Sequence, residues 1–93
     1  MSLKHAELRV SGQTIPAKLA GAIVKTLNEG TPIKMVAIGA DANNSSTKGM
    51  IVANSYLATS GRKLDITPAF GDVLTEEGRE VTAISWFLKL SYI

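Results

Sequence analysis

A chain of 93 residues with 45% hydrophobic content predicts one globular domain, 1–93, and excludes a disordered protein. The absence of cysteine excludes disulfides and thiol chemistry and favours a cytoplasmic setting. A net charge of +2 permits an acidic partner such as nucleic acid without requiring one. Because the N-terminal residues contain no long apolar segment, we expect neither a signal peptide nor a membrane span.

The first part of the chain has the pattern of a strand followed by a helix. Residues 7–10 alternate polar and apolar side chains, which predicts a half-buried strand. Ser11 or Thr14 is a suitable cap for the helix that follows, and Pro16 suits its first turn. Apolar residues then recur at helical spacing until residues 28–30, where Gly30 ends the helix.

A second strand and helix follow. Residues 33–40 have apolar side chains on both faces, which predicts a central strand. The small polar residues at 41 and 43–47 predict a tight turn, and a helix is expected from about Asn44 to Thr59, with Gly61 as its stop. The side chains expected on its buried side are those of Thr47, Met50, Ile51, Asn54 and Leu57.

The last third of the chain predicts two strands, 63–70 and 80–92, joined by a polar connector, 71–79. Pro68 indicates that the first of them is an edge strand or contains a bulge. One side of the last strand is expected to face away from the helices. An uncovered apolar strip there predicts a homodimer or a higher homo-oligomer through Val81, Ala83 and Phe87.

The expected order is therefore β-α-β-α-β-β. Strands that are separated by helices indicate right-handed parallel crossovers, and two crossovers in the same direction place both helices on one face of the sheet. The last two strands form an antiparallel hairpin. The predicted fold class is an α/β two-layer sandwich with a four-stranded mixed sheet.

Polar residues gather at the two predicted strand-to-helix turns. Helix N-termini attract anions, and parallel strands bring such turns to the same edge of a sheet. We therefore predict nucleic-acid contacts there, although simple helix capping explains the amides and hydroxyls equally well, and Asp41 would oppose a phosphate. The candidate residues are Gln13, Thr14, Lys18, Asn43, Asn44, Ser45 and Lys48.

Catalytic and metal-binding patterns are missing from the sequence. His5 is the only histidine, and the carboxylates are scattered, so we expect no enzyme, no cofactor and no metal site. The connector 71–79 and Glu80 contain four acidic residues against Arg79, which should repel a phosphate backbone. Four aromatic residues are expected to be core residues rather than platforms for bases: Tyr56, Phe70, Trp86 and Tyr92.

Short motifs along the chain resemble those of the stage V sporulation protein S family. The resemblance covers nearly the whole chain from Val10 to about Leu88, and its most specific runs are AIGA at 37–40 and PAF at 68–70. The other matching positions are Val10-Ser11, Pro16, Ala20-Gly21-Ala22, Asn44, Lys48, Ser60-Gly61, Leu64, Asp72 and Thr82-Ala83-Ile84.

This resemblance implies a small bacterial cytoplasmic protein that is linked to the regulation of sporulation and septation. It also implies a fold similar to Alba, the archaeal chromatin protein, and to the C-terminal domain of translation initiation factor three. That fold has the sheet order 1-2-4-3, with the last strand antiparallel to the others. Dimers and binding to DNA or RNA are further implications of the resemblance.

The resemblance transfers unevenly to the candidate site. Asn44 and Lys48 match the family directly, whereas Gln13 replaces its first-turn lysine and Asn54 replaces an arginine late in the second helix. Alba's paired lysines correspond to Gln13 and Thr14, and its basic arms correspond to the acidic hairpin 71–80. The leading hypothesis is a non-enzymatic nucleic-acid-binding regulator. The alternatives are a homo-oligomeric interaction or scaffold module and a sensor of small anions or nucleotides.

Overall fold

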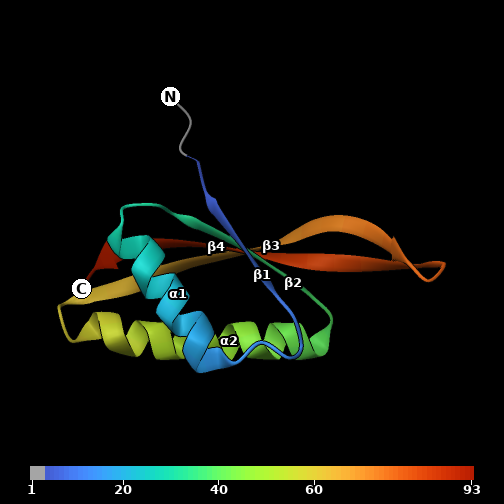
Figure 1. Ribbon diagram of the computed structural model, residues 1–93. Coiled ribbons are helices and arrows are strands. Elements are labelled where there is room, and N and C mark those ends of the chain that lie inside the picture. Colours follow the sequence, from blue (N-terminus) through green and yellow to red (C-terminus); the bar gives the residue numbers. More distant parts are fainter. Residues whose placement is uncertain (1–3) are drawn as a thin grey trace.

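The computed structural model describes residues 4–93, and for residues 72–76 it describes the backbone alone (Figure 1). Two helices and four strands follow one another in the predicted order, β-α-β-α-β-β. Their bounds are β1 Ala6–Val10, α1 Pro16–Asn28, β2 Ile33–Ile38, α2 Ala40–Ala58, β3 Arg62–Glu76 and β4 Arg79–Tyr92. Neither helix in this part of the chain is long and apolar enough to cross a membrane.

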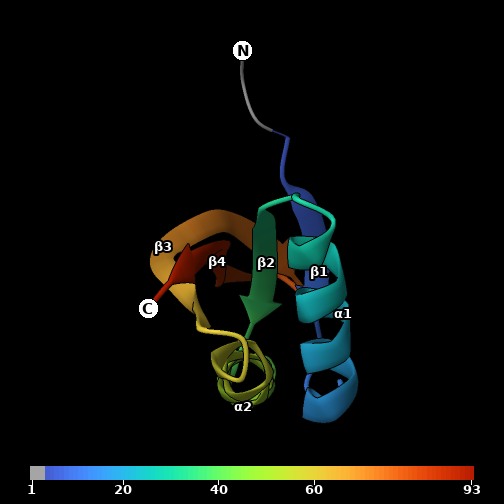
Figure 2. The same ribbon diagram turned by 90° about the vertical axis from the view of Figure 1, so that its left-hand side faces the viewer.

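The four strands form one mixed sheet in the order β1-β2-β4-β3. β1 and β2 are parallel, and β4 is antiparallel to both of its neighbours, β2 and β3. Both helices cover the same face of this sheet (Figures 1 and 2). The predicted two-layer α/β sandwich is therefore confirmed, as is the strand order that the family resemblance implied.

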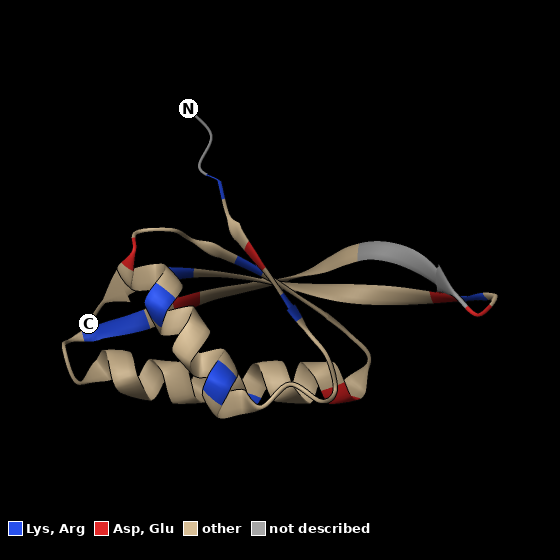
Figure 3. Cartoon of the chain, in the orientation of Figure 1, with Lys and Arg blue, Asp and Glu red and all other residues tan. Residues whose placement is uncertain are grey.

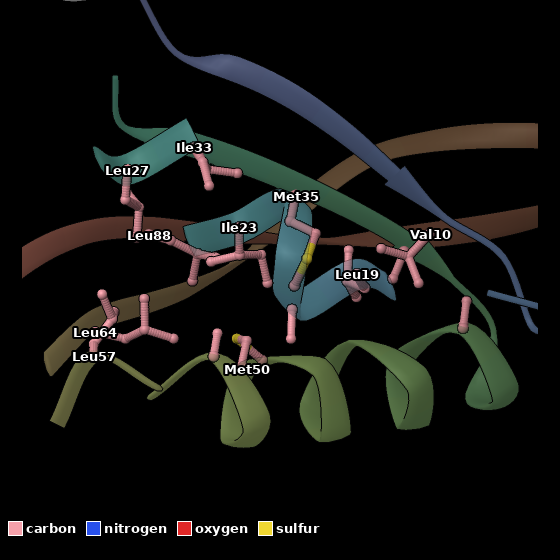
Figure 4. Close-up of a cluster of buried hydrophobic side chains, with 14 residues drawn as sticks. Val10, Leu19, Ile23, Leu27, Ile33, Met35, Met50, Leu57, Leu64 and Leu88 are labelled. Atoms are coloured by element: carbon pink, nitrogen blue, oxygen red, sulfur yellow. The ribbon is translucent and has the colours of Figure 1, made fainter. Parts of the chain in front are cut away.

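The core lies between the helices and the central strands (Figure 4). Ile23 of α1, Leu57 of α2, Met35 of β2 and Leu88 of β4 are almost fully buried there. Each such side chain contributes roughly 1.5–3 kcal/mol by leaving water. β2 lies between β1 and β4, which confirms the central strand that its two apolar faces predicted.

The start of α1 differs from the prediction. Its N-cap residue is Ile15, whose side chain makes no capping hydrogen bond. Ser11 and Thr14 instead hydrogen-bond to each other within the preceding turn. The Thr14 Oγ1 accepts a 2.9 Å hydrogen bond from the Ser11 backbone N–H. Pro16 begins the helix as predicted, and Gly30, with a φ of 87°, ends it.

The start of α2 was also predicted wrongly. The helix begins at Ala40, immediately after Gly39 at φ 89°, so residues 41–47 form its first two turns rather than a loop. The hydroxyls of Ser46 and Thr47 donate 2.9 Å hydrogen bonds to the carbonyls four residues earlier. These side chains therefore bond within the helix instead of capping it.

The buried side of α2 is made mostly of small residues. Met50 and Leu57 are buried as predicted, but Thr47, Ile51 and Asn54 are exposed. Asn54 instead accepts a 3.0 Å hydrogen bond from the Leu64 backbone N–H, which ties β3 to the helix. The other buried residues are Ala42, Ser45, Ser46, Gly49 and Ala53, a stripe that lets α1 approach closely.

The segment predicted as a polar connector is part of a long two-stranded arm. β3 continues to Glu76 and β4 begins at Arg79, so only Glu77 and Gly78 form the turn. Both turn residues have positive φ, 51° and 77°, as a two-residue hairpin with a type I′ turn requires. The arm extends beyond the helices (Figure 1). β3 is an edge strand and its register shifts after Phe70, which confirms both features inferred from Pro68.

The apolar strip expected on the open face is interrupted. Phe87 and Val81 are half-buried, but Ala83 is only 2% exposed and offers no surface to a second copy. β3 covers it at Gly71, where an added Cβ would lie 3.1 Å from the Ala83 Cβ and 2.9 Å from the Ser85 Oγ. This close passage of β3 corrects the prediction that Ala83 belongs to an oligomer interface.

Candidate nucleic-acid interface

Two close contacts bring the strand-to-helix segments together. A Cβ on Gly12 would lie 2.8 Å from the Asp41 Cβ, so the turn before α1 rests against the first turn of α2. A Cβ on Gly49 would lie 2.7 Å from the Leu19 Cδ2, so the helices touch there. Glycine at both positions permits these approaches.

Lys18 and Lys48 flank the second of these contacts. Lys18 precedes Leu19 on α1, and Lys48 precedes Gly49 on α2, so each lysine is next in sequence to a residue of this contact. Figure 3 marks basic residues on both helices near their crossing. Both lysines are exposed. Both predicted lysines therefore lie on the helical turns that meet at this crossing.

Gln13 and Asn44 are exposed as well. Asn44 and Lys48 are four residues apart on α2 and therefore share one face of that helix. Gln13 follows Gly12 in the chain, and its backbone N–H donates a hydrogen bond to the Ser11 Oγ. Thr14 is half-buried, and its hydroxyl is already engaged by Ser11. The side-chain amides of Gln13 and Asn44 take part in none of the described hydrogen bonds.

Two predicted site residues serve the fold instead. The Asn43 Nδ2 donates to the Gly39 carbonyl at 2.9 Å, and its Oδ1 accepts from the Trp86 Nε1 at 3.1 Å. Ser45 is 7% exposed on the buried side of α2. Neither side chain is placed to meet a phosphate, so both leave the candidate interface. Trp86 packs against the core cluster, as predicted. The same prediction was wrong for Tyr56, Phe70 and Tyr92, which are exposed.

Replacing Asn43 by alanine should lower the free energy of unfolding by about 1–2 kcal/mol, because the partly buried indole N–H loses its acceptor. Urea denaturation followed by tryptophan fluorescence measures the loss. The matched control is Asn44→Ala, an exposed position on the same helix turn, which should change stability by no more than about 0.5 kcal/mol. Equal effects of the two variants would contradict a structural role for Asn43.

Asp41 places a negative charge close to both helix starts. It lies in the first turn of α2, where its charge stabilises the helix dipole and occupies that end. The first turn of α1 contains no acidic residue of its own, but the Asp41 side chain lies against Gly12 in the turn before it. A phosphate should therefore approach the lysines at the crossing rather than the N-terminus of either helix.

Other chemistry finds little support among the described residues. Within residues 4–93, apart from the side chains of 72–76, no group of three His, Cys, Asp or Glu residues is arranged to hold a metal. His5 packs its ring against Phe87, with centroids 5.6 Å apart. Glu77 and Glu80 are exposed near the tip of the arm, where Figure 3 shows acidic residues around one basic position.

The match to a protein family extends over almost the same residues as the fold. The family model for stage V sporulation protein S matches residues 6–91, from the first residue of β1 to the penultimate residue of β4. The chain belongs to the stage V sporulation protein S family. Membership relates the protein to sporulation and confirms the resemblance seen in the short motifs.

In this member of the stage V sporulation protein S family, several contacts of the site escaped sequence reasoning. The position of Asp41 against Gly12 and the bond from Trp86 to Asn43 join residues far apart in the chain. Gly12 and Gly49 were the available signals, since an isolated glycine often marks a close backbone approach. A glycine in the sequence does not indicate which residue it will contact, so these contacts could be identified only from the structure.

Proposed function

We propose that this stage V sporulation protein S family member is a cytoplasmic, non-enzymatic regulator that binds nucleic acid through the crossing of α1 and α2. The observation that carries the proposal is the placement of Lys18 and Lys48 on either side of the Leu19–Gly49 contact. Gln13, in the turn before α1, and Asn44, one helical turn before Lys48, are also exposed. Two ammonium groups with neighbouring amides suit phosphate oxygens, which position a partner without reading its sequence.

The same surface limits the strength of binding. Asp41 adds a negative charge at the edge of the site, and Gln13 is neutral where the family resemblance implied a lysine. The exposed Glu77 and Glu80 make the arm unfavourable for a phosphate backbone. We therefore expect weak, sequence-independent binding that depends strongly on salt.

The test is fluorescence anisotropy with a labelled DNA duplex and a labelled RNA at low and rising salt. Binding should be detectable at low salt, and the logarithm of the association constant should fall linearly with the logarithm of the salt concentration. The proposal fails if neither probe binds at low salt. It also fails if the affinity does not decrease as salt rises.

A second candidate function is a homo-oligomeric interaction module, and a specific apolar surface favours it. Phe70 is 83% exposed, Ile51 is 61% exposed and Ile66 is 40% exposed. These side chains come from α2 and the adjoining face of β3, on the side of the sheet that carries the helices. Exposed apolar surface of this kind suits a two-fold contact with another copy.

Phe70→Asp should convert an oligomer into a monomer, because the contact would have to bury an unpaired carboxylate. Light scattering at high protein concentration measures the change. Tyr56→Asp is the matched control, because Tyr56 is exposed in the groove between α2 and α1, away from the patch, and should leave the mass unchanged. A wild-type protein that is monomeric at high concentration would contradict the module.

A further inference from the structure

The face of the sheet opposite the helices carries residues that are not part of the α1–α2 interface. Both helices lie on the other face of the sheet, so neither helix nor any other element of the described residues covers this one (Figures 1 and 2). Strand alternation and register assign its residues, because core residues such as Met35, Trp86 and Leu88 point to the helices. The side chains of the open face near its centre are Glu7, Arg9, Lys34, Val36, Lys63, Asp65, Thr67, Phe87 and Lys89.

Phe87 lies at the centre of this face. It pairs with Lys34 on β2 and with Thr67 on β3, so a lysine and a hydroxyl flank its ring in the same cross-strand row. Its side chain is only half-buried. The ring of His5 stands nearly perpendicular to it, at 77°. An aromatic ring that remains accessible on a sheet is a platform on which a nucleobase can stack.

A hollow adjoins this ring. It has a volume of about 310 Å³ and is lined by His5, Pro32, Asp65, Thr67, Phe87 and Lys89, together with Leu88. That volume lies at the lower end of the range of roughly 300–1,000 Å³ that is usual for small-molecule sites. The hollow therefore has room for one flat ring of a nucleotide beside Phe87.

The charge of the open face is complementary to a phosphate chain. Four basic residues, Arg9, Lys34, Lys63 and Lys89, stand against the two acids Glu7 and Asp65. Glu7 forms a 3.6 Å ion pair with Arg9, and Asp65 forms a 3.6 Å ion pair with Lys89. Among the described residues, Lys34 and Lys63 have no such acidic partner, so their charges are available to a ligand.

We propose that the open sheet face binds single-stranded DNA, with one base stacked on Phe87 in the hollow and phosphates held by Lys34 and Lys63. A single strand is required because bases within a duplex have their faces covered by their neighbours. None of these contacts needs a ribose 2′-hydroxyl. This surface is separate from the α1–α2 interface and its function does not depend on phosphate binding there.

The test uses the full chain and a labelled oligothymidylate of about 12 nucleotides, within the usual range of site sizes. Phe87→Leu should lower the affinity about tenfold, because leucine keeps the apolar contact but removes the stacking surface. Tyr56→Leu is the matched control, an exposed aromatic residue of the helix layer that should have no effect. Lys34→Gln should reduce both the affinity and its salt dependence.

The result also separates the two proposed surfaces. Equal affinities of Phe87→Leu and the wild type would overturn the open-face site, even if Lys48→Glu lowers binding and the α1–α2 interface stands. Binding of oligouridylate without binding of oligothymidylate would overturn it as well. Because Phe87 is half-buried, an NMR titration of the wild type supplies a second measurement. The oligothymidylate should shift the amide signals of Lys34, Thr67 and Phe87, and shifts confined to α1 and α2 would contradict the site.

Discussion

Reversing both charges at the helix crossing, Lys18→Glu with Lys48→Glu, should lower the affinity for duplex DNA on the order of 100-fold at low salt. Each lysine that contacts a phosphate releases a bound counterion, and this release supplies most of the free energy of weak, non-specific binding. A glutamate in its place also repels the phosphate. Both lysines are exposed, so the protein should remain folded. Anisotropy titrations with a labelled duplex measure the loss.

Lys25→Glu is the matched control for the single variants Lys18→Glu and Lys48→Glu. Lys25 is an exposed residue about two turns further along α1, and its reversal changes the net charge by the same amount as Lys18→Glu. It should weaken binding far less, because it lies away from the Leu19–Gly49 contact. If Lys25→Glu weakened binding as much as Lys18→Glu, the affinity would follow the overall charge and the proposed interface would be wrong.

Replacing Gly49 by valine should lower the free energy of unfolding by about 1–3 kcal/mol. A Cβ at this position would lie 2.7 Å from the Leu19 Cδ2 and 3.0 Å from its Cγ, and valine adds two methyl groups beyond it. Leu19 is buried, so its side chain has little room to move away. The helices must separate at their crossing. Urea denaturation measures the destabilisation.

The matched control for this variant is Gly21→Val. Gly21 is also a helical glycine, but no atom lies within 4 Å of a Cβ added there. Valine at that position should be neutral or slightly stabilising, because glycine costs a helix more than valine does. Gly49→Val should in addition weaken duplex binding, since it moves Lys18 away from Lys48. Equal stabilities of the two variants would show that the helices do not touch at Gly49.

Strand alternation and helix endings were sufficient to predict the order of elements. β2 was recognisable as central because apolar residues occupy both its faces, and β3 as an edge strand because of Pro68. The start of α2 was not predictable in this way. Asn, Ser and Thr favour turns as isolated residues, but here Ser46 and Thr47 bond to carbonyls of their own helix, and Trp86 holds Asn43 from β4.

The candidate site was predictable in part for a similar reason. The meeting of the turn before α1 with the first turn of α2 follows from parallel crossovers, which the chain order already indicates. The burial of Ser45 does not, because hydrophobic periodicity treats a serine as a surface residue even when small side chains are needed for helix packing. The covering of Ala83 depends on a register shift in β3, which no local pattern of residues specifies.

The most direct test of the proposed function is the salt dependence of duplex DNA binding by the wild type and by the double variant Lys18→Gln with Lys48→Gln. Neutral glutamines remove the two charges without adding repulsion. If both lysines contact phosphates, the slope of log affinity against log salt should become shallower by about 2 in the variant. Identical slopes would show that neither lysine contacts the backbone, and the crossing of α1 and α2 would not be the binding site.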